Sequence, residues 1–169
     1  MIDVVEREDR ETGTYIERLF EQHARRLGQF LVHVVRDRAL AEDLLQETFL
    51  AAWRARNELE AVVNPEAWLF GIARHRALRS LRGAQRLRRA LERVAANPPA
   101  TTDEGPGAAV DVLALVHRVL SPEDRALVVL RYVHGFDAPE LAAMTGRSPA
   151  AIRKRLERAR TTLLQEAAR

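Results

Sequence analysis

Apolar residues recur at steps of three and four positions through most of this 169-residue chain. From Tyr15 to Val35 they form one continuous stripe, whose members are Ile16, Leu19, Phe20, Leu27, Phe30, Leu31 and Val34. This spacing is typical of an amphipathic α-helix that packs one face on a core. No sustained strand alternation between turn pairs occurs. The sequence therefore predicts an all-α protein.

One segment interrupts the helical pattern. Residues 97–107, NPPATTDEGPG, combine proline, glycine, threonine and acids, and they offer little apolar surface to bury. We therefore expect a flexible linker over residues 94–107 between two small helical domains, residues 10–93 and 108–169. Each domain is expected to fold separately.

In the first domain, a second helix is expected from about Ala39 to Arg56, followed by a loop over residues 57–64. Pro65 fits the first turn of a third helix, because the missing N–H of proline costs nothing there. Gly83 either ends this helix or only weakens it, and the basic segment RLRRALERV that follows is also expected to be helical.

The second domain begins with an apolar helical segment, residues 110–120. Ser121 and Pro122 are typical of the start of the next helix, and Gly135 is expected to end it. These two helices precede the part of the chain with the strongest local signals.

Those signals predict a helix-turn-helix. Asp137 and Glu140 have the spacing of a capping box for a short helix, residues 138–144, and Gly146 lies in the tight turn after it. Ser148 is expected to cap a last helix whose basic residues lie opposite its apolar side. A short helix, a glycine turn and a basic helix form this DNA-binding motif, although a plain helical hairpin has the same pattern.

Composition argues against several classes of protein. Without cysteine the chain has neither disulfides nor thiol chemistry, and a reducing cytoplasm is its expected location. The sequence contains no phosphate-binding loop and no nucleophile elbow, and its five histidines are scattered without helical pairing. We therefore expect no catalytic residue, no metal and no cofactor. With no apolar run of about 20 residues, we also expect no membrane insertion.

The net charge of +3 conceals two basic blocks. Residues 67–93 contain eight arginines and one acid, and residues 147–169 contain seven basic residues and two acids. Each block follows an acidic stretch, which suggests two separate surfaces for polyanions. Solvated arginine-rich helices would give the same count.

The second helix has an unusual outer face. Helical geometry places Leu50 in the middle of a polar stripe, whose other members are Asp43, Gln46, Glu47 and Arg54. A single exposed leucine is ordinary, but one surrounded by polar groups also suits a protein-docking surface.

The candidate DNA-binding residues lie on the two basic helices. On the third helix the outward residues are Arg74, His75, Arg79 and Arg82. Trp68 could stack on an unpaired base or lie in the core. Around the last helix the basic residues are Arg147, Arg153, Lys154, Arg155 and Arg158.

Three segments, AEDLLQETFLAAWR, NPEAWLFGIARHRALRSLR and LSPEDRALVVLRYVHGFDAPELAAMTGRSPAAIRKRLERAR, resemble an extracytoplasmic-function (ECF) sigma factor of the sigma-70 family that carries only regions 2 and 4. The resemblance implies that the second helix docks on the clamp helices of the largest subunit of core RNA polymerase, with further contact to the flap. It implies that the third helix reads the −10 promoter element and the last helix reads the −35 element, where Ser148 and Ala151 join the basic residues. An anti-sigma factor is an expected partner.

The chain departs from the family pattern at two places. His75 and Arg79 stand where many members have Asn and Asp, and residues 150–152 are Ala-Ala-Ile in place of a small residue followed by Thr-Val. These differences affect which promoter sequence the protein is expected to recognise. Two alternatives stay open: a stand-alone helix-turn-helix regulator with an N-terminal dimerisation or sensing domain, and a purely structural adaptor. Copurification with core polymerase would distinguish the first from a sigma factor.

Overall fold

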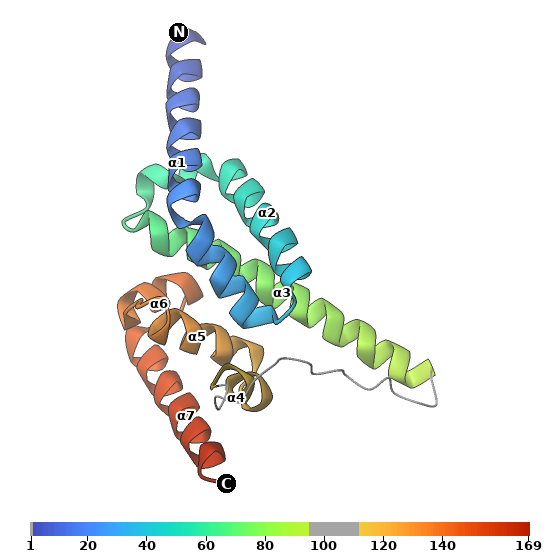
Figure 1. Cartoon of the computed structure of the whole chain (residues 1–169). Helices are drawn as coiled ribbons and strands as arrows, with labels where there is room; N and C mark the ends of the chain where they lie inside the picture. The colour runs from blue at the N-terminus through green and yellow to red at the C-terminus, as the bar shows by residue number, and fades with distance from the viewer. Residues whose placement is uncertain (1, 95–111) are drawn as a thin grey trace.

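The computed structural model describes residues 2–94 and 112–169. Within these ranges every regular element is helical, which confirms the all-α prediction (Figure 1). The elements are α1 (Ile2–Val35), α2 (Arg38–Arg54), the 3-10 helix η1 (Arg56–Ala61), α3 (Pro65–Val94), α4 (Val112–Val119), α5 (Pro122–Tyr132), α6 (Ala138–Thr145) and α7 (Pro149–Ala167).

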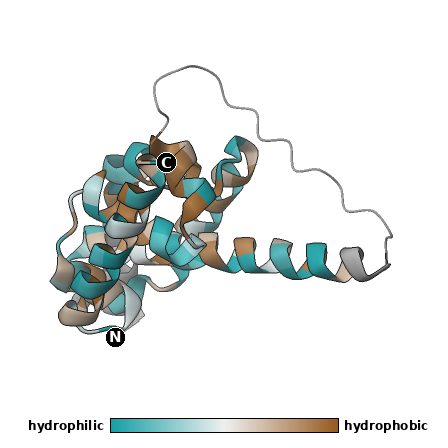
Figure 2. Cartoon of the chain, turned by 90° about the horizontal axis from the view of Figure 1, so that it is seen from below, coloured by the Kyte–Doolittle hydropathy of each residue, from teal (hydrophilic) through white to brown (hydrophobic). Residues whose placement is uncertain are grey.

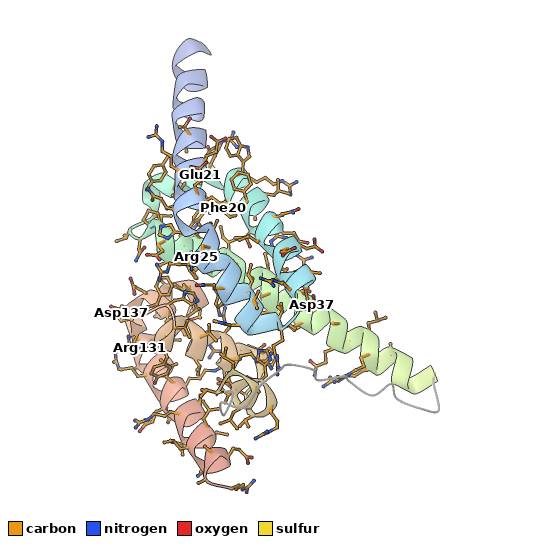
Figure 3. All side chains as sticks on the ribbon, in the orientation of Figure 1. Phe20, Glu21, Arg25, Asp37, Arg131 and Asp137 are labelled. Atoms are coloured by element: carbon orange, nitrogen blue, oxygen red, sulfur yellow. The ribbon has the colours of Figure 1, made fainter. Side chains whose placement is uncertain are left out.

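Helices α1, α2 and α3 pack together as the first half of the molecule. Asp37 starts α2, where its side chain accepts a hydrogen bond from the Leu40 N–H at 3.0 Å, and Figure 3 shows it at the turn from α1. Asn64 starts α3 in the same way, accepting from the Ala67 N–H at 3.0 Å. These caps fix where each helix begins, because the first N–H groups of a helix have no partner within it.

The predicted caps of the second half are confirmed. Ser121 accepts from the Asp124 N–H, and Ser148 accepts from the Ala151 N–H. Asp137 and Glu140 form the predicted capping box of α6 (Figure 3 labels Asp137). Gly146 ends α6 with φ +65°, a left-handed conformation that favours glycine. The helix-turn-helix of α6 and α7 is therefore built by its own local signals.

Three boundaries depart from the predictions or decide between them. α2 ends two residues earlier than expected, and η1 occupies most of the predicted loop. α3 continues through Gly83 to Val94, so this glycine only weakens the helix. Residues 84–90 are all exposed, and this end of α3 projects beyond the other helices (Figures 1 and 2). Nearly all of the expected linker, residues 94–107, lies outside the described residues.

The two halves pack directly on each other, with α5 and α6 against α1 and α3. The ring of His134, from the turn after α5, lies 5.9 Å from that of Phe30 and 5.1 Å from that of Phe70. Phe136 lies 4.9 Å from Phe70, again as ring centroids. The apolar cores of the two halves are therefore continuous in this arrangement.

Candidate nucleic-acid interface

The last helix presents a basic surface on a rigid support. Its inner side is anchored by buried Ile152, Leu156 and Ala159. Its outer side leaves six of the seven residues predicted to read DNA exposed; these are Arg147, Ser148, Ala151, Arg153, Lys154 and Arg158. A capped basic helix with one buried and one exposed side has the form that enters a major groove.

Arg155 differs from its neighbours on α7. Its guanidinium pairs with Asp124 of α5, and its side chain is 21% exposed. Burial opposes ionisation of Asp124, but hydrogen bonds from Arg155 and Ser121 outweigh it, and the pKa of Asp124 lies below its ordinary value. Arg155 therefore fastens α7 to α5 in this structure, and the sequence expectation of an outward side chain fails here.

The basic face of α3 lies on the other half of the molecule. His75, Arg79 and Arg82 are exposed, as expected. Arg74 is only partly exposed, and its Nε atom is buried with no hydrogen-bond partner among the described residues. Burial, and then the positive charge of Arg155, hold the pKa of Arg74 below its ordinary value. Arg74 thus lies toward the second half and departs from the predicted outward arc.

The outer face of α2 is a separate surface. Leu50 is 50% exposed, and Asp43, Gln46 and Glu47 around it are also exposed. The opposite side of the helix is buried and includes Thr48, whose hydroxyl donates to the Leu44 carbonyl at 2.7 Å. The helix therefore does not need Leu50 for its own packing. Arg54, the last predicted member of this surface, is exposed at the end of α2.

A largely apolar groove of about 680 Å³ lies beside the contact between the two halves and is lined by both. One wall comes from the first half and includes Trp68 and His75 of α3, while the other comes from α6 and includes Pro139 and Met144. We call it the interdomain groove. Trp68 is half-buried here, so it is neither fully in the core nor fully exposed for stacking on a base, the two alternatives predicted for it.

Polar contacts also join the halves. Arg26 of α1 pairs with Glu66 and donates to the His134 carbonyl at 2.9 Å. Arg125 of α5 donates to the Val34 carbonyl, also at 2.9 Å, at the end of α1. Two further bonds are Asn64 Nδ2 to Glu140 Oε1 at 2.7 Å and Arg82 to Glu123 Oε1 at 2.8 Å. These contacts hold the two halves against each other in one specific arrangement.

The described ranges, 2–94 and 112–169, contain no group of three or more His, Asp or Glu side chains placed to hold a metal ion. Nor does any helix within them combine the length and apolarity needed to span a membrane.

Comparison with known families assigns both halves. Residues 19–87 match Sigma-70 region 2, and residues 111–163 match Sigma-70, region 4. The chain belongs to the sigma-70 family of RNA polymerase sigma factors. It is therefore a transcription initiation factor, which binds core RNA polymerase and directs it to promoters. Residues 2–94 are called region 2 below, and residues 112–169 region 4.

Named relatives place this sigma factor among the ECF members. The RNA polymerase sigma factor CarQ of Myxococcus xanthus is 37% identical over 145 residues, which cover 84% of this chain and 83% of the relative. The ECF RNA polymerase sigma factor SigL of Mycobacterium tuberculosis is 31% identical over 156 residues, 88% of each chain.

Two solved structures share the fold. RpoE from Bartonella quintana, in complex with the anti-sigma factor NepR, matches with a TM-score of 0.71 and 26% identity, over 88% of this chain and 94% of that one. CnrH, in complex with the cytosolic domain of CnrY, matches with a TM-score of 0.68 and 25% identity, over 95% and 94%.

Most of the residues predicted for each surface lie on one exposed helix face or at its start, whereas Arg74 turns toward the other half and Arg155 pairs with Asp124. The structure also shows contacts that the sequence pattern does not reveal. The sequence predicts Asn64 only as part of a loop and Glu140 only as a capping residue, but Asn64 donates a hydrogen bond to Glu140 across the two regions. The sequence marks His134 only as one of five scattered histidines, but its ring packs against the rings of Phe30 and Phe70. The run of apolar and aromatic residues around His134 was the only available signal.

Proposed function

We propose that the outer face of α2 is the polymerase-docking surface of this sigma factor. Leu50 supplies an apolar anchor, and Asp43, Gln46 and Glu47 surround it with groups that fix orientation. The half-exposed leucine on an otherwise polar face supports this assignment, because the helix core lies on its opposite side. The partner surface is the clamp helices of the largest polymerase subunit, with a further contact to the flap.

We propose that α3 binds the −10 element. Arg79 and Arg82 would neutralise backbone phosphates, and His75 would contact the DNA beside them. Trp68 lies at the edge of the interdomain groove, where an unstacked base could stack on its ring once the groove is open. Arg74 would join this set only after region 4 moves away from it.

We propose that α7 reads the −35 element in the major groove. Arg153, Lys154 and Arg158 project from the exposed side of the helix, opposite its buried side. Ser148 and Ala151 lie at the N-terminal end of α7, where free N–H groups and the helix dipole favour a phosphate. Arg147 precedes this end, and Arg155 stabilises the helix through Asp124.

The same proposal includes no catalytic residue and no cofactor, and it places the protein in the cytoplasm with the DNA. It includes an anti-sigma factor as a regulatory partner, since both structural relatives are described in complex with one or with a partner domain. The observation that supports the proposal is that three separate helices each present most of their predicted contact residues on an exposed face, with Trp68, Arg74 and Arg155 as the exceptions.

The direct test is in vitro transcription with core RNA polymerase on a library of genomic fragments. The full-length chain should start transcription at a defined set of promoters. A variant that combines Arg153→Ala, Lys154→Ala and Arg158→Ala should lose those starts while still copurifying with core polymerase. A chain that binds promoter fragments without polymerase and does not copurify with it would instead be a stand-alone regulator.

A further inference from the structure

We propose that the interdomain groove is a binding site for a small, elongated aromatic carboxylate. Its volume of about 680 Å³ lies within the range of about 300–1,000 Å³ that is usual for small-molecule sites. Such sites combine a mostly apolar lining with a few polar groups that fix the orientation of the ligand. The groove has this composition, with an acidic side chain at one end and a basic one at the other.

One stripe of α3 forms the floor of the groove. Its members recur at steps of three and four positions, as on one face of a helix, and they are Ala67, Trp68, Gly71, Ile72, His75 and Arg76. From Ala67 to Arg76 the stripe runs about 13 Å, at about 1.5 Å per residue. Gly71 leaves the middle of the floor without a side chain, and a Cβ added there would lie 3.7 Å from Cγ of Met144. Two linked aromatic rings with a carboxylate at one end match this length.

The walls of the groove offer contacts suited to an aromatic ligand. Trp68 is half-buried and lines the groove, so its ring is available to a second ring. Met144 brings a polarisable thioether from the facing wall, and such sulfur atoms pack favourably on aromatic rings. The other apolar wall residues are Val62, Val63, Pro139 and Ala143. An aromatic body therefore gains contacts here that an aliphatic chain does not.

The polar groups at the two ends set the direction of the ligand. At the start of α3 the carboxylate of Glu140 lines the groove, and its two oxygens accept from Asn64 Nδ2 and from the Asp137 N–H, each at 2.7 Å. This negative charge repels a ligand carboxylate from that end. At the opposite end of the stripe lie His75 and Arg76. The carboxylate therefore points toward Arg76.

Arg76 is placed to pair with the ligand. Its Nη1 atom lies 3.6 Å from Oε2 of Glu47, which is longer than a hydrogen bond, and its side chain is 30% exposed. A guanidinium presents five N–H donors in a planar fork that matches the geometry of a carboxylate. A ligand carboxylate can thus accept from Arg76 while Glu47 stays near. His75 is exposed beside it.

Occupancy of the groove affects promoter reading, and this consequence rests on the proposed function. Trp68 is the ring proposed to stack on a base of the −10 element, and a ligand packed on that ring excludes the base. A small molecule of this class would therefore lower transcription by acting on the sigma factor directly.

The probe is biphenyl-4-carboxylate, and the matched neutral ligand is biphenyl-4-carboxamide. Isothermal titration calorimetry measures the binding of each to the full-length chain at about 0.1 M salt, where the Debye length of about 10 Å limits long-range attraction. We expect the carboxylate to bind saturably at one site with a Kd below about 1 mM. The carboxamide should bind roughly tenfold more weakly, because it lacks the charge-assisted pairing with Arg76.

Two variants, each with a matched control, test the position of the ligand. Ala143→Phe fills the groove from an exposed position of α6 and should weaken carboxylate binding at least tenfold, whereas Ala84→Phe, exposed on α3 outside the groove, should not. Arg76→Gln should weaken carboxylate binding roughly tenfold and leave carboxamide binding unchanged. Arg79→Gln removes the same charge outside the groove and should change neither affinity by more than about twofold.

The site would be disproved if the natural chain showed no saturable binding, or if Ala143→Phe bound the carboxylate as tightly as the natural chain. Equal affinities for the carboxylate and the carboxamide would refute the proposed orientation, as would a loss in Arg76→Gln that is the same for both ligands. These titrations contain neither polymerase nor DNA, so they test the site even if the chain fails to start transcription.

The exclusion of the base is tested in the transcription assay. Saturating carboxylate should reduce the starts made with the natural chain more than those made with Ala143→Phe, because the filled groove does not take up the ligand. Starts that persist at saturating carboxylate would show that a ligand in the groove leaves Trp68 accessible to DNA.

Discussion

Acidification should lower the free energy of unfolding of this protein through His134, which lies where the two regions meet. Its ring packs against those of Phe30 and Phe70, its Nε2 atom is buried with no hydrogen-bond partner among the described residues, and the guanidinium of Arg26 lies close by. Burial, then the charges of Arg26 and His33, lower the pKa of His134 from 6.5 to about 4. The neutral ring is therefore the form that the folded state favours.

The sign of the effect follows from this lowered pKa. The stabilising contribution is present above pH 6.5 and is lost as the pH falls toward 4, because the unfolded chain takes up the proton first. With these two pKa values, linkage gives a loss of about 2 kcal/mol between pH 7 and pH 5. The ring is only partly buried, so solvent screening reduces the expected loss to about 1 kcal/mol.

The assay is urea unfolding of the natural chain and of His134→Phe, at pH 7 and pH 5. The phenylalanine keeps an aromatic ring in the cluster but cannot take up a proton, so His134→Phe should lose about 1 kcal/mol less than the natural chain between the two pH values. His33, whose pKa burial also lowers, is present in both proteins and cancels in the comparison. Equal losses in the two proteins would refute the reasoning.

Three further predictions concern single positions. Leu50→Asp should change the free energy of unfolding by no more than about 0.5 kcal/mol. The same change should strongly weaken copurification with core polymerase, because it would bury an unpaired charge at the docking surface. A large drop in melting temperature would instead place Leu50 in the core. Lys154→Ala should lower the slope of log affinity for duplex promoter DNA against log salt by about one, if the side chain contacts a phosphate, whereas a slope equal to that of the natural chain would remove Lys154 from the interface. Gly83→Ala should stabilise the chain by about 0.5–1 kcal/mol, because no atom lies within 4 Å of the added Cβ on α3. Gly146→Ala should destabilise it by about 1 kcal/mol, because residue 146 has φ +65°. Thermal melts that gave both changes the same sign would contradict this backbone argument.

The parts of the fold that sequence could predict are those decided within a few residues. Ser121, Ser148 and the pair Asp137 and Glu140 each cap the helix that follows them, and Gly146 turns the chain in a conformation open to glycine. These signals depend on neighbours three or four positions away, so no knowledge of the remaining chain is needed.

The contacts between regions could not be predicted in this way. Asn64 and Glu140 are 76 positions apart, and either alone satisfies a local rule without the other. The sequence pattern predicts Arg155 as one of several outward arginines, but its ion pair with Asp124 on a different helix turns it inward. Each of these side chains has a local role and a distant partner. The sequence pattern predicts the local role but not the distant partner.

The projecting end of α3 amplifies any small rotation of the packed part of the helix. From Arg82 to Val94 the helix runs about 20 Å, at 1.5 Å per residue, and residues 84–90 within this stretch are exposed. A rotation of only about 10° at the packed part of α3 would therefore move the far end by about 3–4 Å, close to the 3.4 Å rise of one base pair. Contacts made at this end of α3 would therefore be sensitive to small changes in the orientation of the helix.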